Sequence, residues 1–176
     1  MLVASAANRN LMMFDDTLTD NAKSLLSLCR SKKIQITTAE SCTGGLISAL
    51  LTSVAGSSDV FERGFVTYTN EAKSSCLGVP RDLIQQYGAV SADVAKAMAK
   101  GALIHSDGIL SISVTGIAGP GGGTEAKPVG LVFIGSCLKG REAIAQKHLF
   151  HGNRGSVRAQ SVECGMALLL SQAQTY

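Results

Sequence analysis

The chain has 176 residues, a formal net charge of +3, 45% hydrophobic residues and 16% charged residues. This length and apolar content suit one domain with a substantial core, and the small, scattered charge excludes a basic stripe that would bind nucleic acid. No run approaches the roughly 18 apolar residues of a membrane span, and the first residues do not resemble a signal peptide. We therefore expect no nucleic-acid or membrane partner, a loose tail over residues 1–16 and a single domain over residues 17–176.

The predicted elements alternate between helices and strands. Apolar residues recur at helical spacing from Leu18 to Cys29, with Asp20 as a candidate cap, and a strand follows from Lys33 to Thr38. These elements predict an α/β fold, a three-layer α/β/α sandwich with a mixed, mostly parallel sheet. The remaining predicted segments are helices over 46–54, 81–87 (with Pro80 at its first position), 91–105 and 154–174, and strands over 61–69, 108–115, 129–138 and 143–150.

Cysteines and histidines restrict the chemistry further. The five cysteines are widely spread, odd in number and without a C-x-x-C pair, which indicates reduced thiols and a cytoplasmic protein. The three histidines have no ligand spacing with one another or with the cysteines. The sequence therefore predicts no metal site.

Ser41 lies at the turn between the first predicted strand and the helix over 46–54. Free N–H groups at a helix start stabilise negative charge, so a serine there has the surroundings that an acyl-transfer nucleophile needs. Two alternatives stay open at this point. Ser41 or Thr43 caps the helix, or Cys42, whose thiolate a helix start favours, is the nucleophile.

A serine nucleophile needs a base, and the sequence places the histidines poorly for that role. Lys73 offers a solution, because a neutral lysine can accept the hydroxyl proton. Its pKa would have to fall from about 10.4 to roughly 7, through burial or a cationic neighbour such as Arg154. The alternative is that Lys73 is a solvated lysine at a helix end, because lysines are mostly exposed.

A glycine-rich loop, Gly116–Thr124, separates two predicted core strands. It lacks the dinucleotide and Walker fingerprints. Backbone donors without obstructing side chains make a good phosphate cradle, whereas in a purely structural crossover the glycines only supply a tight turn. Both interpretations remain open.

Six short motifs follow one another along the chain: TAESCTGG over 38–45, FERGFVTY over 61–68, YTNEAK over 68–73, GAVS over 88–91, GIAGP over 116–120 and KPVG over 127–130. Together they resemble the CinA C-terminal-like family, the nicotinamide-nucleotide amidases, in its stand-alone form. The resemblance implies hydrolysis of the carboxamide of nicotinamide mononucleotide to nicotinate mononucleotide and ammonia, in pyridine nucleotide salvage, with no cofactor. It extends from about Leu18 to the last helix.

The resemblance also implies roles for residues. Ser41 would be the nucleophile and Lys73 its base, with Tyr68 and Arg154 assisting and N–H groups near Cys42 to Gly44 holding the oxyanion. The chain departs from the family pattern at Asn153, where an aspartate is common, and at Gly121, where many relatives carry a larger residue.

A small nucleotide substrate would need further contacts. We also expect a homo-oligomer, and a non-catalytic nucleotide-binding module of the same fold is the alternative function. The candidate substrate contacts are Cys42, Thr43, Gly44, Asn70, Gly116, Gly119, Gly122, Gly123, Lys127 and Arg158.

Overall fold

The computed structural model describes residues 14–176, so residues 1–13 of the expected tail lie outside the described residues. No helix within the described range is long and apolar enough to cross a membrane. The elements are α1 (Asp16–Ser31), β1 (Ile36–Glu40), α2 (Leu46–Thr52), the short 3-10 helix η1 (Ser57–Asp59), β2 (Phe61–Val66), α3 (Asn70–Leu77), α4 (Arg81–Tyr87), α5 (Ala92–Ile104), β3 (Leu110–Gly116), β4 (Leu131–Leu138), β5 (Ile144–Leu149) and α6 (Arg154–Thr175).

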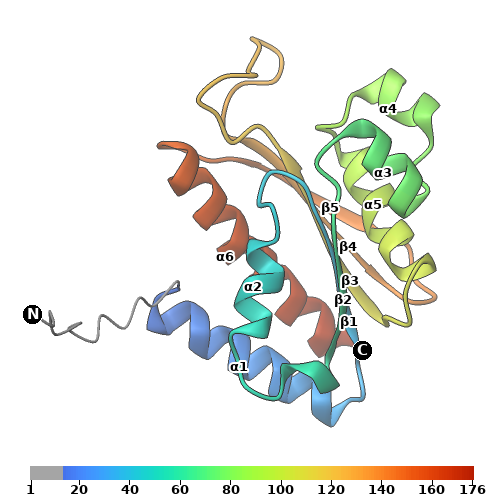
Figure 1. Ribbon diagram of the computed structural model, residues 1–176, viewed down its shortest axis with the longest axis vertical. Coiled ribbons are helices and arrows are strands. Elements are labelled where there is room, and N and C mark those ends of the chain that lie inside the picture. Colours follow the sequence, from blue (N-terminus) through green and yellow to red (C-terminus); the bar gives the residue numbers. More distant parts are fainter. Residues whose placement is uncertain (1–13) are drawn as a thin grey trace, which may run out of the picture.

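The five strands form one sheet in the order β2-β1-β3-β4-β5. β1 pairs in parallel with β2 and β3, and β4 pairs antiparallel with β3 and β5, so β4 runs against the other four strands. Helices α1, α2 and α6 lie on one face, and α3, α4 and α5 lie on the other (Figure 1). The predicted three-layer α/β/α sandwich with a mixed, mostly parallel sheet is confirmed.

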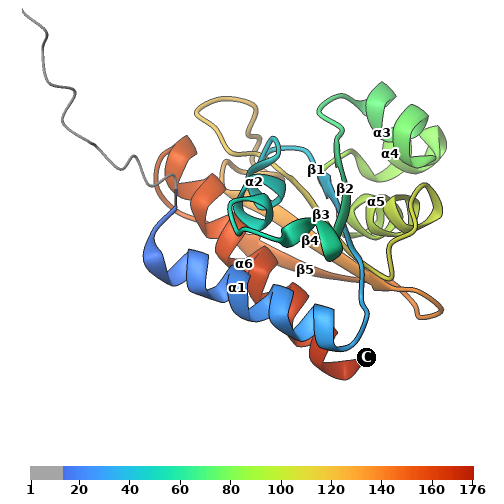
Figure 2. The same cartoon turned by 60° about the horizontal axis from the view of Figure 1, so that its bottom comes forward.

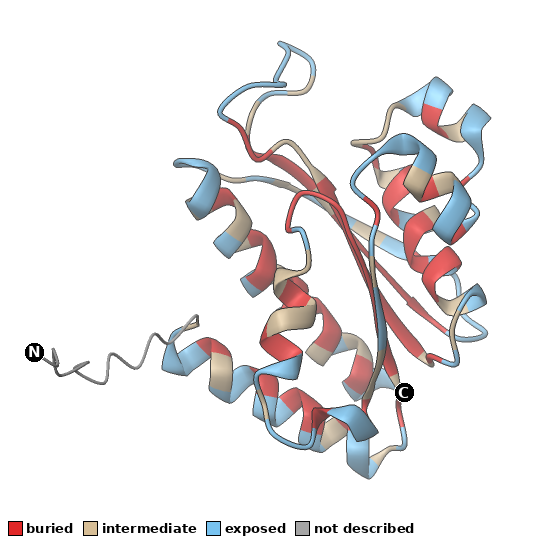
Figure 3. Cartoon of the chain, in the orientation of Figure 1, coloured by how far each residue is buried: buried red, intermediate tan, exposed pale blue. Residues whose placement is uncertain are grey.

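The main core lies between the sheet and the α1, α2 and α6 layer, where α1 and α6 pack side by side (Figure 2). A smaller cluster packs beneath α3, α4 and α5. The central strands are buried on both faces (Figure 3). In β1 this burial includes Thr37, Thr38 and Glu40, so the strand carries polar groups into the interior.

Several boundaries differ from those predicted. The N-cap of α1 is Asp15, not Asp20, because Asp15 Oδ1 accepts a hydrogen bond from Leu18 N at 2.7 Å. The first strand begins later than predicted, at Ile36, and Lys33 has the left-handed φ of +57° in the connection before it. Pro80 is the residue before α4 and not its first residue. Helix α3 is an addition that the sequence analysis does not predict.

Candidate active site

Ser41 follows the last residue of β1 and opens a turn that leads into α2, as its position in the sequence predicts. Its N–H donates to Val114 O of β3 at 2.9 Å, and its carbonyl accepts from Gly44 N at 3.0 Å. Gly44 and Gly45 have φ of +62° and +96°, a conformation that glycine adopts without the steric cost of a side chain. The serine is therefore held by the centre of the sheet and by its own turn.

Lys73 lies in the first turn of α3, a helix that the Thr69 side chain caps by accepting from Ala72 N. Its side chain is only 2% exposed. Nζ donates to Ser41 Oγ at 3.1 Å and to Thr67 O at 2.9 Å. The structure thus brings Ser41 and Lys73 into contact, and the alternative of a solvated lysine is wrong.

Burial lowers the pKa of the Lys73 ammonium, because the charged form loses its hydration. Arg154, the cation considered from the sequence, is not among the causes of this shift. A buried lysine with a lowered pKa, in contact with a serine hydroxyl, is the arrangement that a nucleophile and a general base require.

Arg154 begins α6 after the N-cap Asn153, whose side chain accepts from Ser156 N at 3.0 Å. Its guanidinium donates from Nη2 to Tyr68 Oη at 2.9 Å and from Nη1 to Gly119 O at 3.1 Å. Arg154 therefore ties the segment after β2 to the glycine-rich loop. Tyr68 and Arg154 border a cavity of about 210 Å³ lined by Ser41, Cys42, Tyr68, Asn70, Lys73, Ala89, Val90, Thr115, Gly116, Ala118 and Arg154.

The start of α2 is capped by Glu40, which the sequence analysis does not single out. The N-cap Gly45 has no side chain to cap the helix, so the prediction that Ser41 or Thr43 caps it is wrong. The Glu40 carboxylate accepts from the N–H groups of Gly45, Ile47 and Ser48 at 2.9–3.1 Å. These three N–H groups at the helix start are therefore not free to stabilise negative charge on a substrate.

Two N–H groups of the turn remain available. Gly44 N is engaged with Ser41 O, but within residues 14–176 the N–H groups of Cys42 and Thr43 donate to no oxygen. Both residues directly follow the serine in the chain. An oxyanion hole needs donors close to the nucleophile, and of these two residues Cys42 lines the cavity, so its N–H group is the candidate donor.

Cys42 is a poor rival nucleophile. Its side chain is 5% exposed, and this burial raises the pKa of the thiol to about 11. The nearby backbone N–H groups and Lys73 lower that pKa, but they do not offset burial. The thiol is therefore protonated near neutral pH, whereas the nucleophilic form of cysteine is the thiolate.

Several residues predicted to contact the substrate do not line the cavity at Ser41. Lys127 Nζ donates to Tyr87 O at 2.6 Å, at the end of α4. Arg158 Nη2 donates to the carbonyl of Thr43 at 2.8 Å, and the Thr43 side chain is fully buried. Of the predicted contacts, Cys42, Asn70 and Gly116 line the cavity at Ser41, whereas Thr43, Gly44, Gly119, Gly122, Gly123, Lys127 and Arg158 do not.

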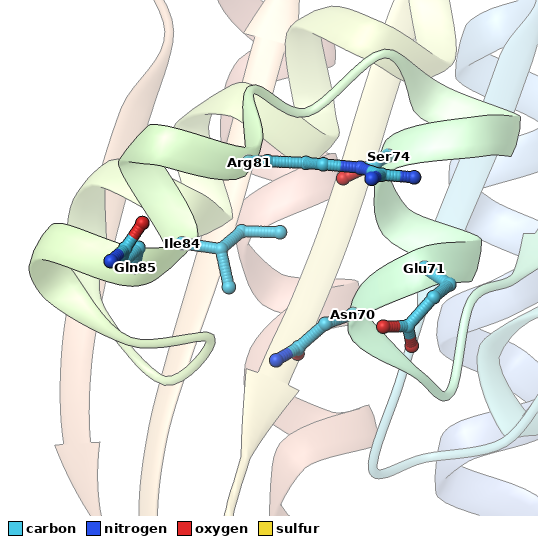
Figure 4. A pocket seen from close by; sticks show the side chains of 6 residues that line it. All are labelled: Asn70, Glu71, Ser74, Arg81, Ile84 and Gln85. Carbon is cyan, nitrogen blue, oxygen red and sulfur yellow. The ribbon is translucent and has the colours of Figure 1, made fainter.

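A second pocket, of about 250 Å³, lies between α3 and α4. Figure 4 shows side chains of both helices around it, with Asn70 and Glu71 on α3 and Ile84 and Gln85 on α4. Asn70 also lines the cavity at Ser41, so the two hollows are neighbours. In the part of the chain that the structure describes, no group of three or more His, Cys, Asp or Glu side chains could hold a metal ion.

Comparison with known proteins shows the following similarities. Residues 18–173 match the family described as "CinA C-terminal domain". Nicotinamide-nucleotide amidohydrolase PncC of Escherichia coli K12 is 41% identical over 160 residues, covering 91% of this chain and 97% of that protein. A putative competence-damage inducible protein of Caldicellulosiruptor bescii is 45% identical over 152 residues, 86% of this chain. The match covers 37% of that relative, so this chain corresponds to about a third of its length.

Solved structures agree with this result. The competence/damage inducible protein CihA of Agrobacterium tumefaciens superposes with a TM-score of 0.88 at 40% identity, covering 90% of this chain and 96% of that one. A CinA superfamily protein from Escherichia coli gives a TM-score of 0.85 at 34% identity, covering 90% and 93%.

Proposed function

The chain belongs to the CinA C-terminal domain family, and on that premise we propose that it hydrolyses the carboxamide of nicotinamide mononucleotide to nicotinate mononucleotide and ammonia, in pyridine nucleotide salvage. The observation that carries the proposal is the 3.1 Å contact between Lys73 Nζ and Ser41 Oγ at a cavity. The similarity to the amidohydrolase PncC over almost its full length supports the substrate. The free state of all five cysteines suits the reducing cytoplasm in which we place the reaction.

The direct test is ammonia release when the purified protein is incubated with nicotinamide mononucleotide. Nicotinate mononucleotide should accumulate in equal amount. The folded Ser41→Ala variant serves as the control for contaminating amidases. No ammonia above that control would overturn the proposed reaction, and the non-catalytic nucleotide-binding module would then be favoured.

In the proposed mechanism, Ser41 Oγ attacks the carboxamide carbon while neutral Lys73 accepts the hydroxyl proton. The N–H group of Cys42, which lines the cavity, stabilises the oxyanion, and one such donor commonly contributes a factor of about 10²–10³ in rate. Lys73 then gives its proton to the departing nitrogen, the C–N bond breaks, and ammonia leaves an acyl-enzyme. Water attacks the ester carbon while Lys73 accepts its proton; the bond from that carbon to Ser41 Oγ then breaks, Lys73 returns the proton to Oγ, and nicotinate mononucleotide leaves.

Tyr68 and Arg154 assist at the mouth of the cavity. The hydrogen bond from Arg154 Nη2 fixes the Tyr68 hydroxyl, and the bond from Nη1 to the Gly119 carbonyl fixes the start of the glycine-rich loop. In this role Arg154 orders the edge of the site and places a positive charge beside a substrate that carries a phosphate.

We expect kcat/KM to rise with pH as Lys73 loses its proton. The pKa of Lys73 is lowered by burial from its ordinary value of 10.5, so the rising limb should lie below that value. Initial rates between about pH 6 and pH 10 measure the limb, because kcat/KM reports the groups of the free enzyme. Cys42→Ser removes the thiol that lines the same cavity and should leave the limb in place. A flat profile over this range would exclude Lys73 as the base.

The glycine-rich loop is proposed to recognise the phosphate, through backbone donors of a segment that begins at the cavity with Gly116. Nicotinamide riboside lacks the phosphate. Loss of two charge-assisted hydrogen bonds, at about 1.5–3 kcal/mol each, should lower kcat/KM for the riboside by roughly 10²–10⁴ relative to the mononucleotide. Rates with both substrates measure the difference.

Gly122→Val tests whether the glycine-rich loop is the segment that recognises the phosphate. Gly122 has φ of +83°, so valine strains the loop there, whereas a side chain at the neighbouring Gly121 meets no atom within 4 Å. Gly122→Val should therefore slow the mononucleotide selectively, and Gly121→Val is the matched control. Equal slowing of both substrates by Gly122→Val in a folded protein would make the loop a structural crossover.

A further inference from the structure

Glu40 is a buried acidic residue at the junction between sheet and active site. It ends β1, and its side chain is 0% exposed. The carboxylate accepts hydrogen bonds from Gly45 N at 3.0 Å, Ile47 N at 3.1 Å, Ser48 N at 2.9 Å and Ser48 Oγ at 2.8 Å. The three backbone partners can only donate, so the group acts there as an acceptor of the kind that an ionised carboxylate provides.

These hydrogen bonds hold together the two ends of the turn between β1 and α2. The N–H groups at the start of a helix carry partial positive charge, which a carboxylate stabilises. Glu40 and Gly45 are the two ends of the turn that contains Ser41, Cys42 and Thr43, and the carboxylate joins those ends directly. The N–H groups of Gly45, Ile47 and Ser48 at the start of α2 are consequently bonded to a group of the protein itself and are not free to bind the substrate's phosphate.

The backbone of Glu40 connects to Lys73. Its carbonyl accepts from Thr67 N at 2.8 Å, and the Thr67 carbonyl accepts from Lys73 Nζ at 2.9 Å. Ser41 is the next residue in the chain. Glu40 is thus one peptide bond from Ser41 and two hydrogen bonds from Lys73. The side chain of Glu40 fixes the turn that carries the oxyanion donor.

We propose that Glu40 is the positioning residue of the Ser41–Lys73 pair. Its carboxylate sets the path of the turn, so that Ser41 Oγ lies 3.1 Å from Lys73 Nζ and the N–H groups of Cys42 and Thr43 stay without a competing oxygen. Glu40 touches no reacting atom and acts through its neighbours. The inference rests on the proposed function for its substrate, but the nucleophile can be tested independently of that substrate.

Glu40→Gln is the informative substitution. Glutamine has nearly the same size but one acceptor oxygen, so its NH₂ group must face N–H donors at the start of α2. Because a misplacement of about 1 Å can cost 10²-fold in rate, we expect kcat to fall by about 10²-fold while KM changes by less than about threefold. Ser48→Ala is the matched control. It removes one of the four hydrogen bonds and keeps the three from the backbone, so kcat should stay within about threefold of the parent.

A second readout separates this proposal from the identity of the substrate. A fluorophosphonate probe reacts with an activated serine hydroxyl, with loss of fluoride, and its rate of labelling at Ser41 reports the nucleophile alone. Glu40→Gln should slow labelling by about the same factor as kcat. If the parent is labelled but does not hydrolyse the mononucleotide, the proposed substrate is wrong, and slowed labelling of Glu40→Gln still supports the positioning role.

Glu40→Asp is a second variant in case the amide prevents folding. It keeps the charge but is shorter by one methylene, so it cannot keep all four hydrogen bonds, and its labelling rate should lie between those of the parent and Glu40→Gln. Folding is checked by far-ultraviolet circular dichroism. Labelling rates and kcat within twofold of the parent in a folded variant would overturn the proposal, as would a loss that the unfolded fraction fully explains.

Discussion

Replacing Ser41 by alanine is expected to lower kcat for amide hydrolysis by about 10³–10⁶-fold, because a positioned nucleophile commonly carries a factor of that size. The fold should persist. The backbone bonds of Ser41 to Val114 and Gly44 are unchanged, and Lys73 retains its bond to the Thr67 carbonyl. Ammonia release measures the loss, and equilibrium binding of the mononucleotide should survive it.

The neighbouring thiol provides the control for this experiment. Cys42→Ser should keep kcat within about threefold of the parent, because burial raises the pKa of the Cys42 thiol to about 11 and leaves it unreactive near neutral pH. More than about a tenth of the parent turnover in Ser41→Ala, a loss of only ~1.4 kcal/mol of barrier, would exclude Ser41 as the nucleophile. Activity that disappears in Cys42→Ser alone would point to the cysteine.

Lys73→Arg and Lys73→Met are expected to be comparably damaging, each lowering kcat by about 10³-fold or more. Arginine keeps the charge but cannot deprotonate to accept the serine proton. Methionine fills the site without an amine. If Lys73→Arg kept most of the activity, the lysine would act through its charge and the proposed proton transfer would have to be abandoned.

Lys73→Arg and Lys73→Met should differ in thermal stability. The pKa of Lys73 is lowered by burial, so between that value and 10.5 the unfolded chain binds more protons than the folded one. The free energy of unfolding of the parent therefore rises with pH across this window, and below it the buried ammonium exerts its full cost. Lys73→Met removes that cost and should raise the Tm at neutral pH, whereas Lys73→Arg should lower it. Thermal melts at pH 7 measure both shifts.

Much of the fold follows from the sequence because its apolar pattern is strong where the core is. The closing helix is predicted over 154–174 and found as α6 over Arg154–Thr175. The strand predicted over 108–115 corresponds to β3, which is buried along almost its whole length. In such segments the apolar residues of the local pattern are the ones buried in the folded protein, so the sequence pattern predicts the element correctly.

Helix α3 shows why the rest could not be predicted. Its sequence NEAKSSCL is short, and its apolar residues Ala72, Cys76 and Leu77 do not form a clear helical stripe. Lys73 and Leu77 are the two buried residues of this helix. A hydrophobic pattern treats a lysine as exposed, so it cannot indicate that Lys73 is buried. The buried amine depends on a contact with Ser41, 32 residues earlier in the chain, which no local window contains.

Glu40 is missed for a related reason. The sequence pattern predicts a strand that ends at Thr38, whereas β1 continues through Ala39 to Glu40 and is buried throughout. A glutamate at the end of a strand is usually solvated. Here its partners are the first N–H groups of a helix five to eight residues later, so only the three-dimensional turn shows its role.

The position of β2 at the edge of the sheet has a consequence for how the site fails. Ser41 follows a central strand, but the base is attached through β2 and α3, and β2 pairs with β1 along one side. Val66, at the end of β2, is 54% exposed. Local openings of a protein cost less free energy than global unfolding, and amide hydrogen exchange detects them. Such openings concentrate where backbone hydrogen bonds are exposed to solvent and buried contacts are few. Fraying of this edge would separate lysine from serine while the core beneath α1 and α6 stayed intact, so heat inactivation would precede melting.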